Sequence, residues 1–253
     1  MIPQPFVKGA GERVFFGPYE YPTGADLIFD FGNPACTSEF NSNRRVYNVG
    51  SANVTASLIA FDNPTPFFPV LKATNGGIAE FNSIGTTQYN YMQWDWKSTA
   101  EQTNIVVYAP SGSQGTRQTV MPQVSGSFKP NSIEFVVVYP GNTIYVDLYD
   151  SSNAADTEFF GAPTFQTGSL NGYNGWNLFA TSADTSSIHN FYVNMATSSF
   201  SSVPLARVTS ATQRSRLPAN AKANIMAFLQ YPKILTPKEI RQVYKVFAQR
   251  FFT

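Results

Sequence analysis

The sequence contains few charged residues for its length. Of its 253 residues, 17 are Lys or Arg and 16 are Asp or Glu, so charged residues make up 13% of the chain, against about 25% in an ordinary soluble protein. The formal net charge is +1. Because binding to nucleic acid needs an excess of Lys and Arg on one surface to neutralise phosphates, we expect no nucleic-acid partner.

Histidine and cysteine are each present only once, as His189 and Cys36. One cysteine excludes an intramolecular disulfide, and one histidine excludes a His-based metal site or a two-histidine relay. The sequence also has no GxSxG motif, no P-loop and no CxxC pair. We interpret Cys36 as a small buried apolar residue and His189 as a structural residue of a strand, and we expect no catalytic residue, no cofactor and no metal.

Long apolar segments are also missing. No window reaches about 18 uninterrupted apolar residues, and residues 1–16 lack a basic segment followed by an apolar one. We therefore expect neither a signal peptide nor a membrane-spanning segment, and no membrane partner.

Aromatic residues and turn formers are abundant instead. Aromatics make up 15% of the chain, and it has 17 Gly and 17 Pro. Short runs typical of β-strands recur about every ten residues between turn signals. They span 27–31, 55–61, 78–81, 89–96, 104–108, 119–124, 133–138, 143–149, 176–181, 188–195, 203–208 and 223–229. This rhythm, without helices between the strands, predicts an all-β fold of two packed antiparallel sheets.

The clearest local pair is a β-hairpin. Its strands cover 133–138 and 143–149, and the turn Tyr139-Pro140-Gly141-Asn142 joins them. The first strand is apolar on both faces, which predicts a central position in a sheet. We expect one domain, residues 23–253, preceded by an N-terminal arm, residues 1–22.

The arm combines prolines and glycines with large apolar residues. Its prolines and glycines prevent a long helix, and exposure of its large apolar side chains to water is unfavourable. Two interpretations remain open: the arm packs along its own domain, or it docks on a neighbouring subunit. The candidate docking residues are Phe6, Val14, Phe15, Phe16, Tyr19 and Tyr21.

A helix is predicted over residues 237–251. Thr236 and Glu239 form a capping box, and Pro237 stands at the first helical position, where its missing N–H is harmless. An apolar stripe follows at helical spacing. It consists of Ile240, Val243, Tyr244, Phe247 and Phe251.

The two ends of this domain resemble concanavalin A-like (laminin-G-like) jelly rolls of bacteriophage virion proteins. The resemblance rests on a last strand leading through a tyrosine into a capped helix and a terminal Arg-Phe, and more weakly on an opening strand closed by a Gly-Asn-Pro turn. The matching positions are Leu27 to Phe31, Gly32-Asn33-Pro34-Ala35, Ile225 to Leu229, Tyr231, Leu235, Thr236, Glu239, Ile240, Tyr244, Arg250 and Phe251.

The resemblance implies a concanavalin A-like jelly-roll sandwich in a virion. It implies a non-enzymatic structural protein that decorates or cements the capsid or forms a head fibre, as a homo-oligomer in contact with other capsid or tail proteins. The alternative is a lectin-like receptor-binding domain of a tail fibre or spike, which binds host glycan. The fold hosts lectins, glycosidases and structural subunits alike, and head and tail both remain open.

A glycan site would use aromatic faces on which sugar rings stack. Trp94 and Trp96 share one face of a strand, which forms either a platform or a core wall, and Tyr173 with Trp176 falls in a Gly- and Asn-rich loop. A glycosidase is disfavoured, because the closest carboxylate pair, Asp147 and Asp150, points to opposite faces of a strand.

Two polar stretches are interpreted as solvated loops. An oxygen-rich stretch could supply calcium ligands, but it lacks the regular ligand spacing and the glycine of a calcium loop. Its members are Asp150, Asn153, Asp156 and Glu158. A basic stretch follows later in the chain, and it consists of Arg207, Arg214, Arg216 and Lys222.

Overall fold

The strands of this protein pair antiparallel throughout the part of the chain that the computed structural model describes. It describes residues 21–61, 68–82, 89–97, 99–110, 117–119, 123–124, 133–138, 143–149, 155–160, 175–184, 188–194, 196–201, 212–218, 222–248 and 250. The arm residues 1–20 lie outside these ranges, so the division into arm and domain stays a prediction.

The larger sheet contains eight strands within the described residues. Its order is β15-β14-β13-β7-β17-β5-β4, and β1 pairs with the second half of β17. The strands are β15 (Ala196–Ser201), β14 (Ile188–Val193), β13 (Asn177–Ala183), β7 (Gln102–Pro110), β17 (Lys222–Tyr231), β5 (Ile78–Asn82), β4 (Val70–Lys72) and β1 (Leu27–Asp30).

A second sheet has five strands among the described residues, in the order β2-β3-β6-β16-β9. They are β2 (Arg45–Tyr47), β3 (Thr55–Phe61), β6 (Tyr89–Lys97), β16 (Thr212–Leu217) and β9 (Gln123–Val124). Buried residues of this sheet and of the eight-stranded sheet belong to one core cluster. The two sheets therefore pack face to face, which confirms the predicted β-sandwich.

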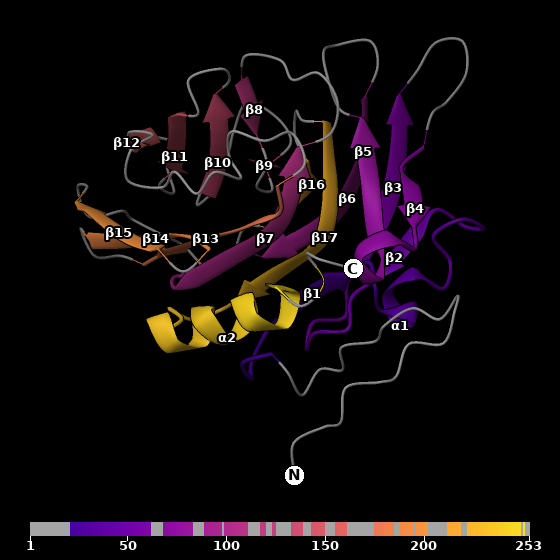
Figure 1. Cartoon of the computed structure of the whole chain (residues 1–253), viewed down its shortest axis with the longest axis horizontal. Helices are drawn as coiled ribbons and strands as arrows, with labels where there is room; N and C mark the ends of the chain where they lie inside the picture. Colours follow the sequence, from indigo (N-terminus) through magenta and orange to yellow (C-terminus); the bar gives the residue numbers. More distant parts are fainter. Residues whose placement is uncertain are drawn as a thin grey trace.

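A four-stranded sheet stands at the top left of Figure 1, on the other side of the molecule from the C-terminal helix. It consists of β12 (Ala155–Phe160), β11 (Thr143–Tyr149), β10 (Ile133–Val138) and β8 (Arg117–Thr119), in that order. The predicted hairpin is present, with Val138 opposite Thr143, and β10 pairs on both edges as expected for a central strand.

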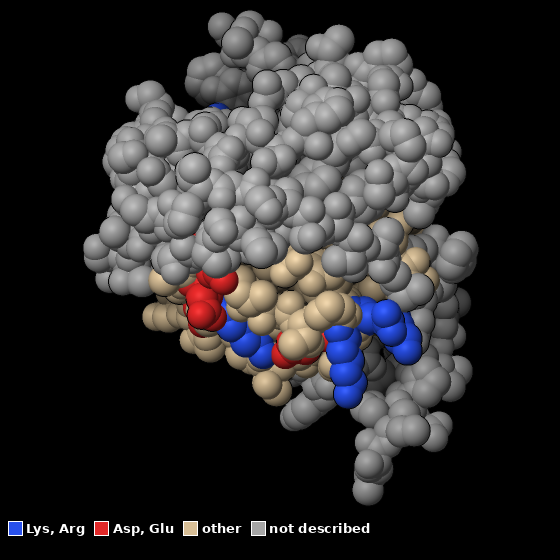
Figure 2. All heavy atoms as spheres, turned by 90° about the vertical axis from the view of Figure 1, so that its left-hand side faces the viewer, with Lys and Arg blue, Asp and Glu red and all other residues tan. Residues whose placement is uncertain are grey.

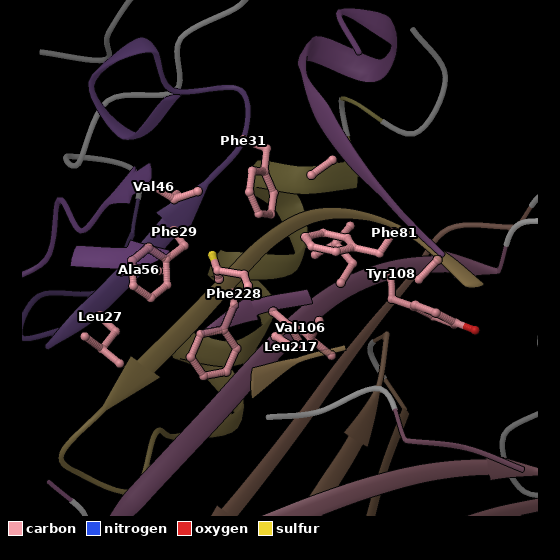
Figure 3. Close-up of a cluster of buried hydrophobic side chains, with 14 of the residues drawn as sticks. Leu27, Phe29, Phe31, Val46, Ala56, Phe81, Val106, Tyr108, Leu217 and Phe228 are labelled. Carbon is pink, nitrogen blue, oxygen red and sulfur yellow. The ribbon is translucent and has the colours of Figure 1, made fainter. Parts of the chain in front are cut away.

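The core between the two sandwich sheets is rich in aromatic side chains. Phe29 and Phe228 from the larger sheet pack on Trp94 from the smaller one, with ring centroids 5.3 Å and 5.4 Å apart. Figure 3 shows the side chains of both sheets converging in this cluster. Aromatic groups bury much apolar area for each residue, so part of the aromatic surplus in the sequence fills this core.

A β-bulge adjusts the central strand β17 to two apolar layers. The register shifts between Ile225 and Ala227. Ile225 and Phe228 belong to the core between the sheets, whereas Met226 and Ala227 both lie in the cluster on the other face. The extra residue thus turns two successive side chains to the same side of the sheet.

The helix α2 (Pro237–Ala248) covers the outer face of the larger sheet. In Figure 1 it runs along the lower left of the sandwich. The capping box forms as predicted: the Thr236 amide and hydroxyl donate to Glu239 Oε2 at 2.8 Å and 2.9 Å, and the Glu239 amide donates to Thr236 Oγ1 at 3.3 Å. The described helix ends at Ala248, three residues before the predicted end at 251.

Several elements differ from the sequence-based prediction. The run 119–124 is two short strands, β8 and β9, and the run 203–208 lies outside the described residues. The Gly-Asn-Pro turn begins a short helix, α1 (Pro34–Thr37), whose N-cap side chain on Asn33 accepts from the Ala35 amide at 2.9 Å. A 3₁₀ turn spans Thr74–Gly76. Strands β2, β4, β12, β15 and β16 were not predicted, because they are short or polar.

The interpretation of the basic stretch as a loop is wrong for the residues that the structure describes. Arg214 and Arg216 lie in β16, and Lys222 begins β17. Their alternation with Ser215 and Leu217 is a strand pattern, since Ser215 and Leu217 are buried. Among the described helices, no helix is long and apolar enough to cross a lipid bilayer.

Candidate functional site

The two segments that carry the family resemblance meet in space. Strand β1 pairs with β17, and Arg250, beyond α2, reaches the end of β1. Arg250 Nη1 lies 2.8 Å from Asp30 Oδ1, and both side chains are only 1% exposed. The resemblance therefore covers one contiguous region, in which the chain's first and last described elements are joined.

The buried ion pair is surrounded by hydrogen bonds. Arg250 also donates from Nε to the Asn75 carbonyl at 3.1 Å and from Nη2 to the Gly77 carbonyl at 2.6 Å. Asp30 accepts from the Gly32 amide and from the Tyr21 hydroxyl, each at 2.8 Å. A buried ion pair is tolerated when its remaining donors and acceptors are satisfied, so we assign this network to structural closure of the domain.

Tyr21 is part of this closure, contrary to its predicted role as a docking residue. Its side chain is buried, and its ring stacks on Phe247 of α2 at 5.8 Å. Burial, followed by the charge of Asp30, raises the pKa of its hydroxyl well above the ordinary value. Tyr21 is therefore an internal anchor of the domain. The other predicted docking residues, Phe6, Val14, Phe15, Phe16 and Tyr19, lie outside the described residues.

The tryptophans of the predicted glycan platform divide between core and surface. Trp94 and Trp96 do share a face, but it is the inward one: Trp94 is 3% exposed and Trp96 packs against the same core. The platform interpretation is thus wrong for Trp94, because a sugar ring cannot reach a buried indole. Trp176 packs, partly buried, against the cluster under α2, and Tyr173 lies outside the described residues.

The structure places the single cysteine in the core and the single histidine in a strand. Cys36 is buried, its thiol faces the Ile28 carbonyl at 3.7 Å, and burial raises its pKa to about 12. The prediction that Cys36 is a small buried residue is confirmed. His189 lies in β14, opposite Phe200. No group of three or more His, Cys, Asp or Glu that could hold a metal ion occurs within the described residues.

The outer face of the five-stranded sheet is the candidate recognition surface. It is the side of the sheet opposite Trp94, which points into the core. We name it the outer face. Its members, all exposed or partly exposed, are Arg45, Tyr47, Thr55, Ser57, Ile59, Tyr91, Gln93, Asp95, Arg214 and Arg216.

Strand pairing arranges the outer face in rows. Arg45 is opposite Ser57, Ser57 is opposite Gln93, and Gln93 is opposite Arg216, so four hydrogen-bonding side chains stand side by side across four strands. The next row contains Ile59 opposite Tyr91. With neighbouring strands about 4.8 Å apart, the polar row is about 14 Å wide.

Aromatic and charged groups are combined at the centre of the outer face. The Arg216 guanidinium lies 5.9 Å from the centre of the Tyr91 ring, and Arg214 pairs with Asp95 at 3.1 Å near the end of β6. Such a surface can bind through stacking, hydrogen bonds and ion pairs. Sequence reasoning did not single out Gln93 and Asp95 and placed Arg214 and Arg216 in a loop, although the alternation around Trp94 and Trp96 already separates Tyr91, Gln93 and Asp95 from the tryptophans.

Comparison with known proteins shows a likeness in structure only. No protein-family model matches the chain, and no curated protein sequence matches it. Solved structures of botulinum neurotoxin binding domains do match. The likeness is one of fold. It is consistent with the β-sandwich described above, and it does not by itself assign an activity.

Three of these structures illustrate the match. One is the binding domain of botulinum neurotoxin DC in complex with rat synaptotagmin II, at 10% identity and a TM-score of 0.64, covering 88% of this chain and 52% of that one. A botulinum neurotoxin type C structure, whose description names interaction with two ganglioside molecules, matches at 10% identity and 0.63, over 88% and 51%. The serotype D binding domain matches at 14% and 0.60, over 88% and 51%. The chain spans about half the length of these structures.

Proposed function

We propose that this chain is a non-catalytic binding subunit of a bacteriophage virion that contacts neighbouring virion proteins through the outer face. The observation that carries the proposal is the asymmetry of the sandwich. Helix α2 covers the outer side of the larger sheet, whereas the described residues of the outer face of the smaller sheet, which include Tyr91, Ile59 and several arginines, are exposed or partly exposed. The virion setting rests on the family resemblance of the two chain ends.

The composition of the outer face supports a protein partner. Protein interfaces combine apolar and aromatic contacts with polar ones, and they are enriched in Tyr and Arg. Here Ile59 and Tyr91 form an apolar pair in one row of the outer face. The row with Arg45 lies next to it, and Asp95 and Arg214 lie one row farther along the strands. Burial of the apolar pair against a partner would contribute about 25 cal/mol per Å² of apolar surface.

Co-sedimentation with virus particles tests the proposal. Particles that lack the subunit are mixed with the purified protein, and bound protein is quantified. Tyr91→Ala and Ile59→Ser should each reduce binding at least tenfold, as expected for central interface residues that cost more than about 1 kcal/mol on truncation. Val70→Ala is the matched control, because Val70 is a surface apolar residue of the other sheet, 40% exposed. Equal binding of all variants would overturn the proposal.

The arm is proposed as a second contact in the same assembly. Since Tyr21 is an internal anchor, deletion of residues 1–20 removes the predicted docking residues Phe6 to Tyr19 and keeps the closure network. Unchanged particle binding by this variant would contradict the docking role of the arm. We further expect symmetric copies of the subunit, which a mass measurement in solution would detect.

A second candidate function is glycan recognition by a receptor-binding domain. The comparisons favour it, because the matched structures are binding domains and one is described as interacting with gangliosides. Trp176 and Tyr91 are two of the partly exposed aromatics in the described part of the chain, and we propose them as stacking surfaces for a sugar. Saturable binding on a glycan array that is lost in Trp176→Ala or Tyr91→Ala, while particle binding is unaffected, would support this candidate over the first.

A further inference from the structure

Helix α2 has one face that the fold does not use. Lys238, Arg241 and Lys245 are all exposed, and at 100° per residue they fall within an arc of about 60°. The opposite side of the helix carries the buried residues Ile240, Val243, Val246 and Phe247. We name the three cations the basic stripe. It extends about 10.5 Å along the helix at 1.5 Å per residue.

The positive charge of the basic stripe is not balanced within the described part of the chain. Glu239, the single acidic residue of α2, is bound to Lys233 Nζ at 2.7 Å and to Thr236. No ion pair of the three stripe residues is present among the described residues. Figure 2 shows lysine and arginine side chains along the lower border of the described surface, at the height of α2, with acidic side chains beside some of them.

Five other cations of the described residues contact an acidic group or an aromatic ring. Lys72 pairs with Glu80, Arg214 with Asp95 and Arg250 with Asp30. Two further guanidinium groups lie over aromatic rings, Arg44 over Phe68 at 4.5 Å and Arg216 over Tyr91. In a chain with so few charges, the concentration of three unbalanced cations on one helix face is therefore a local feature and not the general character of the surface.

Part of the basic stripe opposes the stability of its own helix, although Lys245, in the last turn, is favourable to the helix dipole. Lys238 stands in the first turn, where the helix dipole favours acidic residues. Arg241 is three residues from Lys238 and four from Lys245, and like charges at these spacings repel. Exposed positions that conflict with local stability and have no compensating contact point to a function outside the fold.

We propose that the basic stripe docks an acidic segment of a partner polypeptide. A segment with three carboxylates spread over about 10 Å, such as Asp or Glu at i, i+3 and i+7 of a helix, matches the stripe in spacing and charge. A lipid surface fits less well, because an interfacial helix inserts its apolar side and that side is buried against the sheet. Nucleic acid fits less well, because three cations neutralise few phosphates. The basic stripe and the outer face lie on different sheets, so the proposal does not depend on the particle contact above.

Binding of a labelled 20-residue Asp/Glu-rich peptide to the full chain, followed by fluorescence anisotropy, tests the proposal. The variant Lys238→Gln/Arg241→Gln/Lys245→Gln should bind about tenfold more weakly, the combined effect of three exposed ion pairs. The control Arg44→Gln/Lys72→Gln/Lys222→Gln, at cations outside both the basic stripe and the outer face, carries the same net charge and should change the affinity less than twofold. Circular dichroism checks that both variants are folded.

Two further probes decide the kind of partner. A 20-base-pair DNA duplex and vesicles of 30% phosphatidylglycerol in phosphatidylcholine should bind more weakly than the peptide. The proposal is overturned if the wild-type chain shows no saturable peptide binding, if the stripe and control variants lose affinity equally, or if DNA or vesicles bind more tightly than the peptide. Tyr91→Ala should leave peptide binding unchanged, which separates this test from that of the outer face.

Discussion

The outer sides of the two sandwich sheets differ in what covers them. On the larger sheet, α2 and the segment before it bury residues such as Ile105, Leu229 and Tyr231 under the helix. On the smaller sheet, Ile59 and Tyr91 remain partly exposed among polar neighbours. The residues on the outer side of the larger sheet stabilise the fold, whereas the outer face of the smaller sheet has side chains that a partner can contact. This difference separates the residues that hold the fold from those that can act.

Electrostatic pairs show the same division. Arg250 and Asp30 are 220 residues apart in sequence and almost fully buried. Arg214 and Asp95 lie on the outer face with side chains 59% and 56% exposed. Solvent screens the exposed pair, whereas the buried pair depends on both partners being present. An Arg–Asp ion pair therefore contributes differently to stability when it is buried and when it is exposed to solvent.

The largest expected effect comes from breaking the buried pair. Arg250→Met leaves the Asp30 carboxylate without its cation, which should lower the free energy of unfolding by about 3–5 kcal/mol. Arg214→Met in the exposed pair should lower it by about 1 kcal/mol or less. Urea denaturation followed by tryptophan fluorescence measures both, and Asp30→Asn serves as a milder variant if Arg250→Met does not fold. Similar losses of unfolding free energy for both pairs would contradict the distinction between the buried and the exposed ion pair.

A smaller effect is expected from crowding the same network. A Cβ on Gly32 would overlap the Gly76 carbonyl and stand 2.7 Å from Arg250 Nη2. Gly32→Ala should therefore lower the free energy of unfolding by about 1–3 kcal/mol. At Gly24, with φ +89°, a Cβ meets nothing within 4 Å, so Gly24→Ala tests backbone strain without overlap at about 1 kcal/mol. Equal stability of Gly32→Ala and the wild type would show that the neighbouring turn can move.

The capping box at the start of α2 should contribute less and depend on pH. Partial burial acts to raise the pKa of Glu239, but the hydrogen bonds from Lys233 and Thr236 outweigh it, and the pKa lies below its ordinary value of 4.5. A carboxyl with a lowered folded pKa stabilises the fold above its unfolded pKa, and this stability is lost as the pH falls through the folded pKa.

Two variants check this pH dependence. Glu239→Gln should be less stable than the wild type above about pH 5, and the difference should shrink as the pH falls below 4.5. Thr236→Ala should cost about 0.5–2 kcal/mol at neutral pH through loss of the cap. Thermal denaturation between pH 3 and 7 provides the measurement. A difference for Glu239→Gln that does not change with pH would contradict the assigned role of the carboxylate.

The smallest effect on stability is expected on the outer face. Tyr91→Ala removes a partly exposed ring and its contact with Arg216, which should cost about 1 kcal/mol or less. Phe228→Ala, a buried ring of the core, should cost about 3–5 kcal/mol. If Tyr91→Ala destabilised the chain as strongly as Phe228→Ala, the outer face would belong to the fold and not to recognition.

Much of the fold follows from local sequence patterns. Residues 55–61, 133–138 and 143–149 form strands with the predicted bounds. The cap and apolar stripe of α2 are both present as predicted. Patterns failed where strands are short or polar, as in β15 and β16, because Ser and Arg carry little β-propensity and their strands form by pairing with neighbours.

The candidate site was less predictable than the fold. Trp94 lies in the core and Tyr91 on the surface because one particular face of β6 packs against the larger sheet. The alternation of residues in β6 divides them between two faces, but it does not say which face is buried. The rows of the outer face depend on the register of four strands distant in sequence. Arg250 and Asp30 both fall in segments that carry the family resemblance, but no sequence pattern predicted that they pair with each other.

The sequence by itself therefore determined the class of the protein: few charges, one histidine and one cysteine, regular β-runs and one capped helix specify a β-sandwich through local preferences and periodicity. The tertiary structure decided which surfaces stay open. Only packing places α2 over one sheet and leaves the described outer-face residues of the other sheet exposed or partly exposed, and only chain closure brings Arg250 to Asp30. Both depend on contacts between residues that are far apart in sequence, and a local sequence pattern does not predict such contacts.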